Sequence, residues 1–268
     1  MESRNPVFSR SKPFQRGGYA TFNTASAASP PDLEYAYGLP SATSAQTGRM
    51  TLDDVVVRTA ALFAVLLTTA AATFFVLTPS LLVVLGAGIV GFILAMVASF
   101  GKPKPPVMIA YAAVEGVFVG GLSAWYTLVY GNGLVPQAVL GTLAAFGAML
   151  ALYKTGVVRN SPKFTKMLMI AGAGYIAFGL LNMMLSMFSV GGWQNVYTSG
   201  GLLPVLISGF GVVLASFFLV LDFDFAEQGI RNGLPRAYAW TAAFGLVVTL
   251  VWIYLEILRL LAILRGND

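Results

Sequence analysis

Seven long apolar blocks, separated by short polar or basic connectors, constrain the fold of this chain more than any other feature. Each block is long enough to cross the hydrocarbon core of a bilayer as an α-helix, which takes about 20 residues. Helices are expected because lipid offers no hydrogen bonds to an open backbone. The sequence therefore predicts an all-α integral membrane protein with seven transmembrane helices, at residues 53–77, 80–100, 107–130, 137–153, 166–188, 202–225 and 237–264.

Composition supports this fold class and excludes several functions. The chain is 57% hydrophobic and 10% charged, whereas a soluble domain carries about 25% charged residues. It has no Cys and no His, which excludes disulfides, thiol catalysis and most zinc or copper sites. No nucleotide-binding loop or hydrolase motif occurs. We therefore expect neither an enzyme nor a resident cofactor.

Residues 1–50 precede the first apolar block and differ from it in composition. They are rich in Ser, Thr, Ala, Pro and Gly and lack an apolar core that could form a signal peptide. We interpret them as a disordered cytoplasmic tail with possible contacts to a partner, and residues 51–268 as the transmembrane domain.

The basic residues predict an orientation in the membrane and argue against nucleic acid as a partner. The net charge of +5 comes from Lys and Arg in short connectors beside the apolar blocks. By the positive-inside rule, these connectors and the N-terminus face the cytoplasm. With seven full spans the C-terminus is outside, and six spans plus a partial seventh are the alternative. The basic connectors carry Lys102, Lys104, Lys154, Arg159, Lys163, Arg231 and Arg236.

Ionisable side chains within or at the ends of the apolar blocks are the candidate functional residues. A charge at the bilayer centre costs about 2.5–3.5 kcal/mol on insertion scales, so such residues commonly mark ion pathways or proton relays. The candidates are Arg58, Glu115, Asp222, Asp224, Glu227 and Glu256.

Two of these acids have a local structural explanation. Glu227 lies four residues before Arg231, the favoured order for an ion pair along a helix. Glu256 lies three residues before Arg259, which permits a similar pair. The alternative for both is a place on an ion pathway.

Asp222 and Asp224 lie two residues apart, about 200° around a helix, so they point to different sides. Both are expected at the C-terminal end of a helix, where the macrodipole disfavours negative charge. They are therefore candidates for a proton sensor that needs no histidine. The alternative is a pair of interfacial aspartates that face water or bind Arg231 or Arg236.

Glu115 lies well inside the third block with no basic residue nearby in sequence, which favours a role as ion ligand or relay. Arg58 lies one turn into the first block and is a candidate counter-ion for Glu115, Asp222 or Asp224. Its alternative is a side chain that extends to the interface. Beside Glu115, Gly116 and Gly120 form a pattern of small residues that predicts close helix packing.

Several motifs occur together in an order typical of one family. They are AYAAVEGVFVGGLS, QAVLGT, ALYKTGVVRNSPKFTK, LVLDFDFAEQGIRNGLP and LVWIYLEILRLLAIL. Across about residues 50 to 265 the chain resembles the Bax inhibitor-1 family, and most closely its bacterial branch.

The resemblance implies a seven-helix fold with the last helix at its centre, and a pH-sensitive calcium leak. In that family a pair of aspartates on helices six and seven forms the gate, and an arginine can lock it closed. Asp224 matches the helix-six aspartate. The helix-seven position falls near Val248 or Thr249, which are not acids, and the nearest acid, Glu256, is expected about 28 Å along that helix.

The leading hypothesis is a pH-sensitive cation leak channel in the plasma (inner) membrane, with calcium as the permeant ion. Glu115 and Glu256 would be the intramembrane acids, Asp222 and Asp224 the inner mouth and sensor, and Glu115 and Asp224 the candidate calcium ligands. The alternative is a non-conducting regulatory protein that binds a membrane-anchored protease or another membrane protein.

Overall fold

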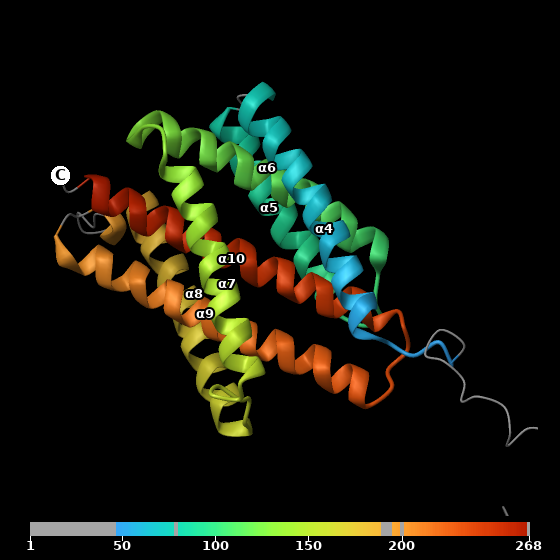
Figure 1. Ribbon diagram of the computed structural model, residues 1–268. Helices are drawn as coiled ribbons and strands as arrows, with labels where there is room; N and C mark the ends of the chain where they lie inside the picture. The colour runs from blue at the N-terminus through green and yellow to red at the C-terminus, as the bar shows by residue number, and fades with distance from the viewer. Residues whose placement is uncertain (1–46, 78–79, 189–194, 199–200, 267–268) are drawn as a thin grey trace, which may run out of the picture. The chain divides into compact units, whose positions relative to one another are not determined.

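The computed structural model of the protein describes residues 47–77, 80–188, 195–198 and 201–266, which contain helices but no strand. Seven of these helices are long and apolar enough to cross a membrane, which confirms the predicted fold class. The expected tail lies outside the described residues up to residue 46. The elements are α4 (Leu52–Ala72), η3 (Thr73–Leu77), α5 (Leu81–Ser99), α6 (Pro105–Tyr130), α7 (Leu134–Lys154), α8 (Pro162–Met187), η5 (Val196–Thr198), α9 (Leu202–Arg231) and α10 (Tyr238–Gly266) (Figure 1).

Several helices extend beyond the apolar blocks that predicted them. α8 begins at Pro162, because proline is tolerated in the first turn of a helix, where the amide has no partner within the helix. α9 continues past residue 225 to Arg231. Hydropathy shows only which part of a chain is apolar. Polar residues can extend a helix beyond its apolar part when their side chains pair with one another along the helix surface. Asp222 and Asp224 therefore lie within α9 and not at its C-terminal end.

The last helix forms the centre of the transmembrane domain. α10 packs against α9, α4, α7 and α6 (Figure 1). α5 packs on α6, and α8 packs on α9. Half of the apolar window of α6 and of α10 is buried, compared with 17% in α4, α5, α7 and α8. This arrangement confirms a central last helix, and α10 is one continuous helix of 29 residues, so a partial seventh span is not needed.

Small residues allow α4 and α6 to approach each other closely. A Cβ atom at Gly116 would overlap the hydroxyl of Thr69 and the carbonyl of Leu66. A Cβ atom at Gly120 would lie 2.8 Å from the Cα atom of Ala70. Because backbone atoms cannot move aside as a side chain can, these two positions require glycine. The small-residue pattern therefore has the packing role predicted from the sequence.

We expect Gly120→Ala to separate α4 from α6 and to destabilise the folded protein by about 1–3 kcal/mol, the usual cost of overpacking. Gly86→Ala is the matched control, because no atom lies within 4 Å of its Cβ position on α5. Thermal unfolding of both variants in detergent, followed by tryptophan fluorescence, measures the difference. Equal melting temperatures for the two variants would show that the close approach is not needed.

Candidate functional site

The carboxylate of Asp222 lies between α9 and α10. Its Oδ2 atom accepts a hydrogen bond of 2.6 Å from Oγ1 of Thr249. A Cβ atom at Gly245, one turn before Thr249 on α10, would lie 2.9 Å from its Oδ1 atom. The absence of a side chain at Gly245 thus leaves room for the carboxylate, and Thr249 supplies its donor.

Glu115 on α6 lies in a different interface from Asp222, and each is well inside its helix. By the rise of an α-helix, Asp222 is about 13 Å from Arg231 at the end of α9, and Glu115 is about 15 Å from Pro105 at the start of α6. Both helix ends adjoin connectors that contain basic residues. Glu115 faces α5, where a Cβ atom at Gly91 would lie 2.7 Å from its Oε2 atom.

Glu115 is a buried acid without a counter-ion in the described part of the chain. Its exposed fraction is 8%, and none of the hydrogen bonds or ion pairs among the described residues involves its side chain. Arg58, its expected counter-ion, binds another acid. Within the described residues no three acids come close enough to hold a metal ion together.

Arg58 binds Asp54, and not Asp222, Asp224 or Glu115 as the sequence suggested. Its Nη1 atom lies 2.7 Å from Oδ1 of Asp54, and Nε of Arg236 lies 2.7 Å from the same oxygen. Asp54 stands one turn before Arg58 on the same helix, which places its carboxylate within reach of the guanidinium. The four-residue spacing could have predicted this pair, but an acid in the first turn of a helix is ordinary.

Asp54 is the functional candidate that sequence reasoning missed. We call Thr51, Asp54, Arg58 and Arg236 the Asp54 cluster; Thr51 donates to Oδ2 of Asp54 at 3.0 Å. Beside the cluster, the amide of Met50 donates to the carbonyl of Leu234 at 2.8 Å. These contacts tie the start of α4 to the connector between α9 and α10, the two helices that hold Asp222.

Asp224 points away from Asp222, as their spacing predicted. Its Oδ2 atom accepts hydrogen bonds of 2.6 Å from the side-chain amides of Asn160 and Gln228. Asp224 binds neither Arg231 nor Arg236. It therefore links α9 to the connector between α7 and α8, which also contains the basic residue Arg159.

Glu227 forms the predicted ion pair with Arg231. Its other carboxylate oxygen accepts a hydrogen bond from the hydroxyl of Tyr153 on α7. Both partners of the ion pair are exposed, and exposed pairs add little stability. The local structural explanation is thus confirmed for this acid.

Glu256 forms the second predicted ion pair, at 3.0 Å from Nη1 of Arg259. It also accepts hydrogen bonds from Tyr175 of α8 at 2.9 Å and from Trp252 at 3.2 Å. The guanidinium of Arg259 lies 4.5 Å from the ring centroid of Tyr197. Glu256 is about 27 Å along α10 from Tyr238. Its carboxylate has hydrogen-bond and ionic partners, and its bond to Tyr175 joins α10 to α8.

We expect Asp54→Asn to destabilise the protein by about 3–5 kcal/mol, because it leaves the half-buried Arg58 without its counter-ion. The amide hydrogen of Met50 should exchange faster, since the connector loses its ionic contact through Arg236. Asp53→Asn is the matched control, because Asp53 is the exposed neighbour of the buried Asp54. Hydrogen exchange with mass spectrometry measures both, and unchanged protection of Met50 in Asp54→Asn would contradict the role of the cluster.

Comparison with known protein families matches the chain to one of them over nearly its whole length. The family described as Bax inhibitor 1 like matches residues 5–266. A comparison with curated proteins gave no match. The family match covers all seven helices, including the α9 and α10 segments that hold Asp222 and Thr249. The chain therefore belongs to the Bax inhibitor 1 like family.

Proposed function

We propose that this protein is a pH-sensitive cation leak channel with calcium as a permeant ion, and that Asp222 is its proton sensor. The observation that carries the proposal is the carboxylate of Asp222 between α9 and α10, above Gly245 and hydrogen-bonded to Thr249. An acid in that interface has little reason to persist for stability alone, because an apolar side chain would pack there without the cost of burying a charge.

The chemistry of this contact couples charge to helix packing. The ionised carboxylate attracts cations and accepts the hydrogen bond of Thr249, and hard oxygen ligands suit calcium. Protonation removes the negative charge and changes the hydrogen-bonding capacity of the group. The attraction for a cation and the α9–α10 contact then change together, which shifts the balance between closed and open states.

Thr249 is one of the two residues, with Val248, near which the family resemblance places a helix-seven aspartate. A carboxylate–hydroxyl pair has one proton-sensitive group, whereas a pair of aspartates has two coupled ones. We therefore propose a gate that responds to a single proton at Asp222. This assignment moves the sensor from Asp224, which binds Asn160 and Gln228 instead.

The other acids have distinct roles in this proposal. Glu115, buried and without a counter-ion, is the second acid that a permeant cation meets. Asp224 attracts cations near the basic end of the domain. Glu256 is held by Arg259 and stabilises the far end of α10. The Asp54 cluster holds α4 against the α9–α10 connector and resists movement of α10.

We propose that the protein lies in the bacterial plasma (inner) membrane with its N-terminus in the cytoplasm. The connectors after α5, α7 and α9 contain the loop Lys and Arg residues, and those after η3, α6 and α8 contain none. The positive-inside rule assigns the first set to the cytoplasmic side. Asp222 would then sense the pH of the cytoplasm.

We expect Asp222→Asn to lower calcium flux about tenfold, the effect of losing about 1.4 kcal/mol of interaction with the ion. Flux through the unaltered protein should fall as the pH is lowered, because protonation neutralises the same group. Flux through Asp222→Asn should not vary with pH. Purified protein in liposomes that contain a calcium indicator measures both, with Asp53→Asn as the control.

If calcium flux through Asp222→Asn still depends on pH, Asp222 is not the proton sensor. If the pH dependence is lost in Asp224→Asn instead, Asp224 is the sensor. Absence of flux from folded, unaltered protein would overturn the channel. It would leave the non-conducting regulatory protein that binds a membrane-anchored protease or another membrane protein.

Gly245→Ala tests the glycine beneath the carboxylate without altering charge. Its methyl group would crowd Oδ1 of Asp222, so we expect a weaker pH response and a loss of about 1–3 kcal/mol in stability. Gly209→Ala on α9 has no atom within 4 Å of its Cβ position and should behave as the unaltered protein. The same liposome assay and a melting curve compare them. Identical behaviour of the two variants would contradict a tight fit at Gly245.

A further inference from the structure

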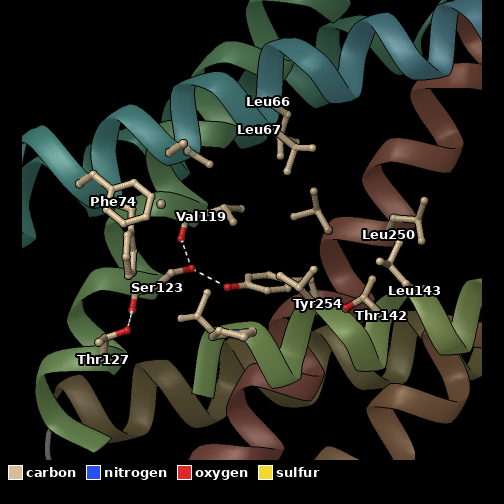
Figure 2. Close-up of a pocket in the computed structure, with 18 of the residues that line it drawn as sticks. Leu66, Leu67, Phe74, Val119, Ser123, Thr127, Thr142, Leu143, Leu250 and Tyr254 are labelled. Atoms are coloured by element: carbon tan, nitrogen blue, oxygen red, sulfur yellow. Dashed lines mark hydrogen bonds between the residues drawn. The ribbon is translucent and has the colours of Figure 1, made fainter. Parts of the chain in front are cut away.

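Helices α4, α6, α7 and α10, with η3, line a cavity of about 630 Å³ (Figure 2). This volume falls within the range of about 300–1,000 Å³ typical of sites for small molecules. The cavity is separate from the carboxylates, since none of Glu115, Asp222 or Glu256 lines it. Its wall is formed mainly by aliphatic and aromatic side chains, such as Leu66, Phe74 and Leu250.

The few hydroxyl groups in the wall already have partners. The hydroxyls of Ser123 and Tyr254 lie 2.6 Å apart, as Figure 2 shows. Thr127 donates to the carbonyl of Ser123 at 2.9 Å, and Thr142 donates to the carbonyl of Ala138 at 2.8 Å. None of the described residues that line the cavity is charged. The wall therefore suits a hydrocarbon ligand better than a polar one.

The cavity opens toward the lipid-facing surface between α4 and α7. Over their described residues these two helices share no extensive packing interface. Residues that line the cavity from both sides also belong to the outer surface: Leu67 is 59% exposed and Leu143 is 60% exposed. Because both helices span the membrane, the surroundings of this opening are acyl chains.

The length of the cavity matches one leaflet of a bilayer. Its lining extends along α4 and η3 from Phe63 to Phe75, a rise of twelve residue steps or about 18 Å. Half of the hydrocarbon core is about 15 Å thick. An acyl chain of one leaflet, aligned with these helices, therefore fits the cavity along its length.

One end of the cavity reaches the turn between α6 and α7, at Asn132 and Gly133. Arg265 of α10 lies beside this turn, where its Nη1 atom donates to the carbonyls of Tyr130 at 3.1 Å and Asn132 at 3.2 Å. A guanidinium at the membrane interface suits a phosphate group, which accepts charge-assisted hydrogen bonds. One end of the apolar cavity is thus close to the positive charge of Arg265.

We propose that this cavity is a lipid-binding site that holds one acyl chain of a membrane phospholipid, with the phosphate of that lipid beside Arg265. The acyl chain fills the space between α4 and α7. It packs against both helices where they do not pack extensively against each other. The site does not depend on the proposed channel activity.

The test uses the full-length protein in liposomes with a phospholipid that carries a photoreactive diazirine in one acyl chain. After illumination, mass spectrometry of peptides shows which residues are labelled. We expect labelling of the cavity wall on α4 and α7 to exceed labelling of lipid-facing residues outside it by at least about fivefold, because a bound chain stays there longer than bulk lipid.

Val139→Trp fills the opening from α7 and should reduce labelling of the cavity wall severalfold. Leu140→Trp is the matched control, because Leu140 is the next residue on α7, is 67% exposed and does not line the cavity. A melting curve confirms that both variants are folded. If Val139→Trp does not fold, Leu143→Trp makes the same test from one turn farther along α7.

Equal labelling of the cavity wall and of the outer surface would overturn the proposal. So would equal loss of labelling in Val139→Trp and Leu140→Trp. Strong labelling by a diazirine fatty acid, with none by the phospholipid, would also overturn it, because the proposed ligand includes the phosphate group.

Discussion

Charged groups between membrane helices must find their partners within the protein, because the surrounding lipid supplies neither water nor counter-ions. Asp54 meets this requirement with two arginines and a threonine. Glu256 meets it with an arginine, a tyrosine and a tryptophan. Among the described residues, Asp222 has one side-chain donor, Thr249, and Glu115 has none. Asp54 and Glu256 are thus held by several side chains each, whereas Asp222 and Glu115 are not, which is why the proposed function assigns the proton sensor and the second acid to Asp222 and Glu115.

The central helix α10 contributes residues to most of these contacts. It supplies Gly245 and Thr249 to Asp222, places Glu256 against α8, and contributes Tyr254 to the apolar cavity. Its first residues follow Arg236, which binds Asp54 at the start of α4. A shift of α10 would therefore change the carboxylate site and the cavity together. Such a coupling would let a lipid in the cavity influence the proposed gate.

Contacts within one helix could be predicted from the sequence, and contacts between helices could not. The pairs Glu227–Arg231 and Glu256–Arg259 follow from helical spacing, and both occur. The same spacing rule allows Asp54–Arg58, but an acid in a first helical turn is ordinary, and the sequence therefore makes Arg58 a candidate partner of more distant acids. The contact of Asp222 with Thr249 joins residues 27 positions apart, and only the packing of α9 on α10 determines it.

Sequence patterns alone predict the membrane environment, the seven helices, the family, the opposite directions of Asp222 and Asp224, and close packing at Gly116 and Gly120. These properties depend on hydropathy, composition and the period of one helix, all of which are local. The tertiary structure alone decided which acid meets α10, which acid holds Arg58, and where a cavity remains. Those outcomes depend on how helices turn about their axes and pack, and neighbouring residues in the sequence do not specify that rotation.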